Sequence, residues 1–380
     1  VQCLKVVQTE SNVIVPSMRK IFFPVNESIS VVPVNDLPEK VKVSSSASTS
    51  ENYSNYVVLG AGKTGTDAVL YLLDNGIDQS NITWIMPRDP WYFNRRGLAS
   101  STVSYWANLK NMLIDPVIMS SNMEKCFLNW EKVGLMMRVD QKIMPERFLG
   151  AVIEPLELEK IRTIQNIVRL GRVTSITLEE IVLERGNVSF SADDTLFVDC
   201  MADKFNGYFS FDQDFQIFNK DRIRLGPLPV TYNPSGSAAL LAYLEAKIAD
   251  DDVKNNFIYY AKGDKNYQQC STMELFFLSI YYQTKTFSRL AEHYPPAMSF
   301  MLNSRTHLDA PMHHGGFLPF LWALFGPLKV KKTMDGFLEK VEEGGYGMDV
   351  SIPDKIDVDR KVVAAASRDS SHKRKGVCCS

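Results

Sequence analysis

The part of the sequence best suited to chemistry is a glycine-rich stretch, YVVLGAGKTGTDAV, at residues 56–69. Gly60, Gly62 and Gly65 follow an apolar run at the G-x-G-x-x-G spacing of dinucleotide-binding turns. In such a turn the first glycine makes the bend, the second lets the backbone approach a pyrophosphate, and the third lets helix and strand pack closely. The spacing therefore predicts a turn that binds a dinucleotide.

A P-loop for ATP is the competing interpretation, because Lys63 and Thr64 follow Gly62. The pattern G-x-x-x-x-G-K-[ST] needs a further glycine at the position of Val57, so the P-loop is excluded. We expect Lys63 and Thr64 to cradle phosphate, with an ordinary role at a helix N-terminus as the equal alternative. The predicted cofactor-binding residues of the turn are Gly60, Ala61, Gly62, Lys63, Thr64, Gly65 and Asp67.

The elements needed to position this turn are predicted on both sides of it. Residues 56–59 form a short apolar strand, and TDAVLYLLDN has helical spacing up to Gly76, where a helix can end. A second strand, ITWIMPRD, follows at residues 82–89. Strand, helix and strand form a βαβ unit, and the helix N-terminus would offer N–H groups to an anion.

The end of the second strand predicts which nucleotide is bound. An acidic side chain there accepts hydrogen bonds from the ribose of NAD, whereas an arginine accommodates the 2′-phosphate of NADP. Arg88 comes first and Asp89 second, with Arg95 and Arg96 beyond them. We therefore predict NADP bound through Arg88, with NAD as the alternative. The other interpretation is that Arg88 and Asp89 pair with each other on a solvated loop.

The composition limits the function classes. A net charge of −2 over 380 residues, with no basic stripe, argues against nucleic acid and leaves a small-molecule substrate as the expected partner. Six scattered cysteines and no signal-peptide pattern indicate a cytoplasmic protein. The apolar run FLPFLWALFG is too short to span a membrane. The basic tail ending in Cys378 and Cys379 could contact a membrane if acylated, and an unstructured tail is the favoured alternative.

Side chains for acid–base or metal chemistry are few. All five histidines lie from His293 onward, and HLDAPMHHGG matches no ligand spacing, so we predict no metal site. No nucleophile pattern occurs, and no catalytic residue can be nominated. Tyr-x-x-x-Lys occurs at Tyr243 and at Tyr281, and a flavin-free dehydrogenase built on either pair ranks third among our interpretations.

Beyond the βαβ unit the periodicity divides the chain. Residues of about 97–165 have helical spacing, and residues 171–200 alternate as short strands that end at Asp199, a candidate site residue or a turn former. A long amphipathic helix follows, which we expect Ser237 to cap and the acidic run 250–252 to close. The last 130 residues read as helical and aromatic.

VVLGAGKTGTD followed by ITWIMPRDPWYFNR resembles the NADPH-binding segment of two-dinucleotide-domain flavoproteins. Flavin-containing monooxygenases carry G-x-G-x-S-G-x-D there, and this chain has Thr64 for the serine and Asp67 for the final acid. Residues 15–260 look closer to an uncharacterised group of FAD/NAD(P)-binding oxidoreductases with VDC and an EA…DD..KN helix, here Val198 to Cys200 and Glu245 to Asn255.

The resemblance implies an α/β fold in which a Rossmann-like three-layer NAD(P)-binding domain is inserted into a partial FAD-binding-type domain, with a helical C-terminal region. The implied parts are 1–52 (strands and Ser-rich linker, a remnant of the FAD-type domain), 53–200 (the NAD(P) domain with a helical insertion at about 97–165), 201–360 (the returning FAD-type segment and helical region) and 361–380 (a disordered basic tail).

The chain departs from the family at its start, because residues 1–55 contain no glycine and hence no FAD-binding turn. Three explanations are open. The FAD-binding segment could lie upstream of this sequence, which the initial Val1 favours. Alternatively, the protein could have lost flavin, or it could bind flavin by contacts that the sequence does not reveal. Our leading interpretation is an NAD(P)H-dependent flavoprotein oxidoreductase with FAD as second cofactor. A monooxygenase is one candidate for its reaction. The alternative is a non-catalytic nucleotide-binding or interaction module that has lost flavin.

Overall fold

The computed structural model describes residues 5–8, 21–41, 53–98, 112, 115–148, 150–201, 216–225, 234–260, 271–303 and 335–343. Predictions that fall outside these residues are the Ser-rich linker at 44–52, the histidine stretch 307–316, the apolar run 317–326 and the tail 361–380. The fold is α/β, and the chain divides into two compact units. Unit 1 comprises Val1–Asn12, Gly97–Leu135 and Asn206–Ser380, and unit 2 comprises Val13–Arg96 and Met136–Phe205.

Unit 2 is built on a five-stranded sheet in which every neighbouring pair is parallel. Its strands, in spatial order, are β2 (Val31–Pro33), β12 (Thr195–Asp199), β3 (Asn55–Leu59), β4 (Ile82–Ile85) and β8 (Asn166–Val168). The chain runs from β3 outward to β4 and β8, and then returns to β12 on the other side of β3. The order of the strands therefore reverses between β3 and β12.

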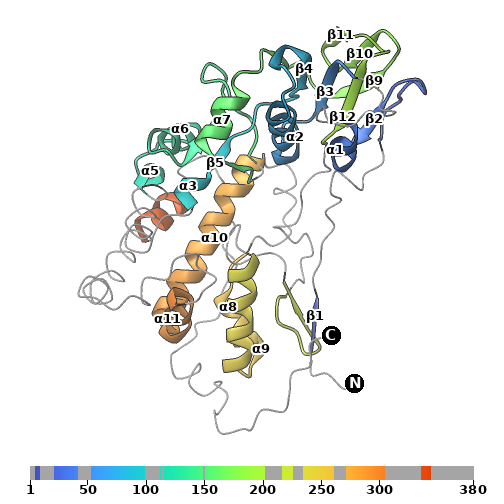
Figure 1. Ribbon diagram of the computed structural model, residues 1–380. Coiled ribbons are helices and arrows are strands. Elements are labelled where there is room, and N and C mark those ends of the chain that lie inside the picture. The colour runs from blue at the N-terminus through green and yellow to red at the C-terminus, as the bar shows by residue number, and fades with distance from the viewer. Residues whose placement is uncertain are drawn as a thin grey trace. The chain divides into compact units, whose positions relative to one another are not determined.

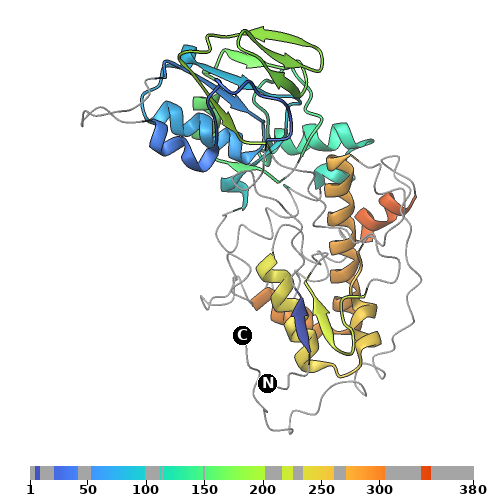
Figure 2. The ribbon, with the colours of Figure 1, turned by 90° about the vertical axis from the view of Figure 1, so that its right-hand side faces the viewer.

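Two different layers cover the two faces of this sheet (Figure 1, Figure 2). Alternate side chains of a strand point to opposite faces, and β3 is apolar on both. Tyr56 and Val58 pack with the helices α2 (Lys63–Asp74) and α7 (Pro155–Ile161). Val57 and Leu59 pack with an antiparallel sheet of β9 (Val173–Ile176), β10 (Glu180–Leu183) and β11 (Gly186–Ser189). Unit 2 thus has three layers, and the third is a sheet.

Short elements complete unit 2. They are η2 (Val34–Asp36), α1 (Leu37–Lys40), η3 (Gln79–Asn81), β5 (Tyr92–Asn94), β6 (Met136–Met137) and β7 (Val152–Ile153), while α3 (Arg95–Leu98) crosses into unit 1. Strand β5 pairs with β6 and β7 in a small sheet of its own. A helical insertion was expected at about 97–165. The helices α5 (Asp115–Ile118), α6 (Met123–Lys132) and α7 do form there, but the residues are divided between the units and also include two strands, because β6 and β7 pair with β5.

Unit 1 is mainly helical in its described part. Its elements are β1 (Val6–Gln8), α5 (Asp115–Ile118), α6 (Met123–Lys132), β13 (Arg222–Arg224), α8 (Pro234–Lys247), α9 (Asp251–Phe257), α10 (Thr272–His293), α11 (Pro295–Asn303) and a helix over 335–342. Strand β1 pairs in parallel with β13, although the two are more than 200 residues apart in sequence. In the sequence, unit 2 interrupts unit 1 and is itself interrupted by Gly97–Leu135 of unit 1.

Within the first 52 residues, β2 is an edge strand of the sheet that contains β3. Two local predictions were wrong for physical reasons. Ser237 does not cap a helix, since α8 already begins at Pro234 and Ser237 is buried within it. The acidic run does not end α8 either. Asp250 is the N-cap of α9 and accepts hydrogen bonds from the N–H groups of Asp252 and Val253, at the helix end where negative charge is favourable.

Candidate functional site

The glycine turn joins the C-terminal end of β3 to the N-terminus of α2. Strand β3 lies in the middle of the parallel sheet, at the place where the strand order reverses. In open parallel sheets, ligands bind outside the carboxyl ends of the strands at such a reversal. The turn therefore lies where the topology of unit 2 favours a ligand.

Two of the three glycines are required by the fold itself. Gly60 has φ +111°, and a Cβ added to it would lie 3.1 Å from the carbonyl oxygen of Cys200. A Cβ on Gly65 would lie 2.0 Å from the carbonyl oxygen of Gly60. Only glycine avoids both conflicts, so Gly60 and Gly65 are explained without any ligand.

Gly62 is different. Its φ of −74° and ψ of −177° are ordinary extended values that any residue adopts. Apart from Gly62 itself and its two neighbours in the chain, no atom of the described residues lies within 4 Å of the position that its Cβ would take. Packing therefore gives no reason for glycine here. Gly62 is also the N-cap of α2 and provides no side-chain cap, which leaves the first amides of the helix available to an anion.

Buried polar side chains form hydrogen bonds to the backbone of the turn. They were not among the residues predicted from the sequence. The indole Nε1 of Trp84 donates to the carbonyl oxygen of Gly60 at 2.8 Å. The hydroxyl of Tyr92 donates to the carbonyl oxygen of Ala61 at 3.1 Å, and that of Thr66 lies 3.2 Å from the Tyr92 hydroxyl. Burial raises the pKa of Tyr92, so its hydroxyl keeps its proton. In the sequence, the one signal of this role is that Trp84, Tyr92 and Thr66 carry polar groups within otherwise apolar elements.

The remaining predicted residues of the turn lie on the first turns of α2. Thr64 is half-buried. Lys63 forms an ion pair with Asp67 one helical turn later, and the two side chains are 35% and 52% exposed. The structure thus brings the ammonium group of Lys63 toward a carboxylate, a contact that the sequence analysis did not expect.

The end of β4 carries the predicted nucleotide-selecting residues. Arg88 is 43% exposed, and its Nε lies 4.0 Å from a carboxylate oxygen of Glu146. Asp89 is 7% exposed and is held by two hydrogen bonds from Arg169, of 2.8 and 3.1 Å. The expected alternative, a pair between Arg88 and Asp89, is wrong because Arg169 at the end of β8 takes the carboxylate.

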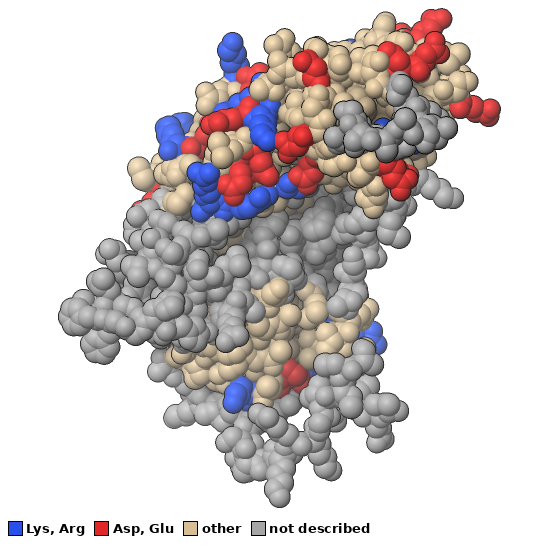
Figure 3. All heavy atoms as spheres, viewed as in Figure 1, with Lys and Arg blue, Asp and Glu red and all other residues tan. Residues whose placement is uncertain are grey.

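The other two arginines of this region have partners on α7 and its cap. Arg95 lies 3.6 Å from Glu157, and Arg96 donates to Glu154 at 3.0 Å. On the face of the molecule drawn in Figure 3, lysines and arginines are interspersed with acidic side chains. Of the three arginines that were predicted to lie near a bound nucleotide, Arg88 has the longest distance to its acidic neighbour among the described residues.

Two residues at the end of β12 flank the turn. Asp199 is buried, and its side chain accepts a hydrogen bond from the N–H of Met201 at 3.0 Å, which is the turn-forming role. Cys200 is also buried. Burial, and then the charges of Asp199 and Asp67, raise the pKa of its thiol. A protonated thiol is a poor nucleophile, so Cys200 is not suited to covalent catalysis.

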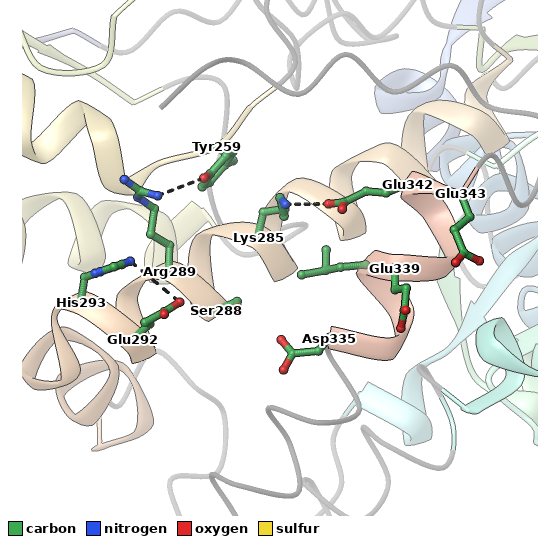
Figure 4. Close-up of a pocket in the computed structure, with 11 residues that line it drawn as sticks. Tyr259, Lys285, Ser288, Arg289, Glu292, His293, Asp335, Glu339, Glu342 and Glu343 are labelled. Atoms are coloured by element: carbon green, nitrogen blue, oxygen red, sulfur yellow. Dashed lines mark hydrogen bonds and ion pairs between the residues drawn. The ribbon is translucent and has the colours of Figure 1, made fainter. Parts of the chain in front are cut away.

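A second candidate site is an open groove of about 600 Å³ in unit 1, between α10 and the helix over 335–342 (Figure 4). At one end Lys285 forms a 2.6 Å ion pair with Glu342, and the hydroxyl of Tyr281 donates to the same carboxylate at 2.9 Å. Both members of one Tyr-x-x-x-Lys pair are therefore engaged by Glu342. In the other pair, the ring of Tyr243 stacks on Phe300.

The EA…DD..KN residues also have a structural explanation. Lys254 is fully buried and forms ion pairs with Glu245 and Asp251, and both carboxylates also pair with Lys5, the residue directly before β1. The side chain of Asn255 bonds to the backbone of Phe218 in both directions, at 2.9 and 2.7 Å. These residues hold β1 and the segment before β13 against α8 and α9.

The described part of the chain contains no cluster of three or more His, Cys, Asp or Glu residues suited to a metal ion, and His307, His313 and His314 lie outside it. Within the same residues, none of the helices combines the length and the apolar character needed to cross a bilayer.

Comparison with known proteins finds uncharacterized relatives. No protein-family model matches the chain. Uncharacterized proteins of Mycobacterium bovis and of two strains of Mycobacterium tuberculosis are each 32% identical to it over 244 residues. The match covers 64% of this chain and 42% of each relative, so the chain spans less than half the length of the curated relatives it matches.

Proposed function

We propose that unit 2 is a Rossmann-type domain that binds NADP(H) at the turn from Gly60 to Gly65. The observation that carries this proposal is the contrast among the glycines. Gly60 and Gly65 are required by packing, whereas the Cβ position of Gly62 has no described neighbour within 4 Å. A pyrophosphate against the backbone of Gly62 and the first amides of α2 would account for a glycine that the fold does not need.

The topology of the sheet supports the same proposal. Counted from the strand before the turn, β3, β4, β8 and β12 stand in the spatial order 3-2-1-4, which matches the first four positions of the Rossmann order 3-2-1-4-5-6. The chain enters unit 2 after Asn12, passes through unit 1 from Gly97 to Leu135, and leaves unit 2 after Phe205, an arrangement compatible with a nucleotide domain inserted into another domain. An FAD-binding type for unit 1 remains part of the proposal.

The nucleotide is NADP rather than NAD in this proposal. Arg88 follows β4 and is 43% exposed, and its acidic contact within the described part of the chain, with Glu146, is 4.0 Å long, so its guanidinium can turn to a 2′-phosphate. Lys63 and Thr64 complete the phosphate site. For Lys63 this requires the ion pair with Asp67 to open or to share the ammonium group with the phosphate.

The reaction class follows from the resemblance to two-dinucleotide-domain flavoproteins. We propose an NAD(P)H-dependent flavoprotein oxidoreductase, with monooxygenation of a small molecule as one form of the reaction. FAD enters this proposal through the resemblance alone, because the described residues contain no second glycine turn of this kind. When bound, flavin would accept hydride from NADPH, and the residues of this chain would orient the nicotinamide nucleotide.

The experiment is an absorbance spectrum of the purified protein, followed by titration with NADPH. The proposal predicts flavin bands that bleach when NADPH is added. A colourless protein that still binds NADP would favour the alternative, a nucleotide-binding or interaction module without flavin. A protein that binds neither nucleotide would overturn both.

A further inference from the structure

The bidentate pair between Arg169 and Asp89 lies at the position that selects the nucleotide. Asp89 follows β4 by a few residues, and Arg169 directly follows β8, the next strand of the sheet. The contacts are 2.8 Å from Nε to one carboxylate oxygen and 3.1 Å from a terminal nitrogen to the other. Such two-point pairs fix the orientation of the carboxylate as well as its charge.

An acidic side chain at this end of the second strand commonly accepts hydrogen bonds from the ribose hydroxyls of NAD and repels a 2′-phosphate. Asp89 would be the acid to do this. Its carboxylate is instead 7% exposed, and both of its oxygens accept from Arg169. Its neighbour Arg88 remains 43% exposed. The carboxylate of Asp89, which would favour NAD, is therefore buried against Arg169. The guanidinium of Arg88, which would favour NADP, is exposed.

We infer that Arg169 is a specificity-determining residue, which makes the site select NADP over NAD by holding the Asp89 carboxylate away from the ribose. This inference rests on the proposed nucleotide binding at Gly60 to Gly65. Arg169 does not have to touch the nucleotide, so it acts as a positioning residue through Asp89. The second strand end alone cannot reveal this role, because the arginine comes from another strand about 80 residues later.

The test measures dissociation constants for NADP and for NAD on the full chain, by calorimetry, in the wild type and in Arg169→Gln. The wild type should prefer NADP. Releasing Asp89 should weaken NADP binding and strengthen NAD binding, so that the ratio of the two constants shifts toward NAD by roughly tenfold or more. Arg172→Gln, the same change at an exposed arginine three residues on, is the matched control and should leave the ratio unchanged.

A second variant separates selectivity from stability. In Arg169→Gln combined with Asp89→Asn the carboxylate is gone, so the ratio should return toward the wild-type value. A merely structural role would weaken both nucleotides alike and would not be reversed by the second substitution. If Arg169→Gln folds poorly, Arg169→Lys keeps the charge with one donor group and should give an intermediate ratio.

The possible outcomes separate the role of Arg169 in selectivity from nucleotide binding itself. A wild type that prefers NADP and an Arg169→Gln variant with the same preference would overturn the role of Arg169 and leave nucleotide binding intact. A wild type that binds neither nucleotide would overturn the proposed function and this inference with it.

Discussion

At the scale of single residues, the glycines divide into those that the fold needs and one that it does not. Gly60 has a positive φ. Gly65 lets the start of α2 approach the carbonyl oxygen of Gly60 more closely than any residue with a Cβ would allow. Gly62 satisfies neither condition. The same six-residue pattern therefore contains two structural positions and one that calls for a functional explanation.

Gly65→Ala tests the structural half of this statement. The added Cβ would lie 2.0 Å from the carbonyl oxygen of Gly60, so the turn or the helix must move. We expect a loss of about 3 kcal/mol in the free energy of unfolding, at the upper end of the usual cost of overpacking. Urea unfolding followed by circular dichroism measures it. A variant as stable as the wild type would show that the close approach is not as the structure has it.

At the scale of elements, the sequence predicted the strand–turn–helix–strand unit well because its signals are local. The strand over 56–59, the helix toward Gly76 and the strand from Ile82 all correspond to observed elements. The apolar periodicity and the helix-ending glycine lie within a few residues of the strands and the helix that they determine. The nucleotide-binding role of the turn is still a prediction.

The parts that the sequence did not reveal depend on contacts between distant segments. Tyr92 reaches back 31 residues to Ala61, and Arg169 reaches back 80 residues to Asp89. Strands β6 and β7 are two residues long and exist only because β5 pairs with both. No local periodicity encodes such pairings, so the sequence predicted the helices of this region, of which α6 and α7 form, and missed the strands β6 and β7.

Tyr92→Phe tests how the elements below the turn support it. The change keeps the ring and removes the hydroxyl that donates to the carbonyl oxygen of Ala61 and contacts Thr66. Because these groups are buried, we expect a loss of about 1–2 kcal/mol in stability. NADP affinity should also fall if the turn is less well held. Tyr71→Phe, on the half-buried face of α2, is the control. Equal stability of Tyr92→Phe and the control would contradict the supporting role.

At the scale of the whole molecule, an ion cluster joins segments from far apart in the chain. Lys5 pairs with Asp251 at 2.5 Å and with Glu245 at 3.4 Å, and Lys254 lies beneath them, fully buried. These contacts connect the residue before β1 to α8 and α9, which are separated from it in the sequence by unit 2. Burial alone would raise the pKa of Asp251, but the hydrogen bonds and charges of Lys254 and Lys5 outweigh it and lower the pKa.

Asp251→Asn tests this cluster through its pH dependence. A carboxyl whose pKa is lower in the folded than in the unfolded state stabilises the fold above its unfolded pKa, near 3.8. That stabilisation is lost as the pH falls through the folded pKa. The variant should therefore have a lower urea midpoint than the wild type at pH 7, and the difference should shrink below about pH 4. Asp252→Asn, one residue away and exposed, should change the midpoint little. A difference that does not vary with pH would contradict the assignment.

The most direct test of the central claim compares Gly62→Ala with the wild type for binding of NADPH, measured by fluorescence titration, with the melting temperature recorded for both. Because the new methyl group meets no described atom within 4 Å, the melting temperature should stay the same. The methyl group would occupy the approach to the backbone, so the affinity for NADPH should fall by roughly tenfold or more. Unchanged affinity in a normally folded variant would contradict the claim that a dinucleotide binds against this turn.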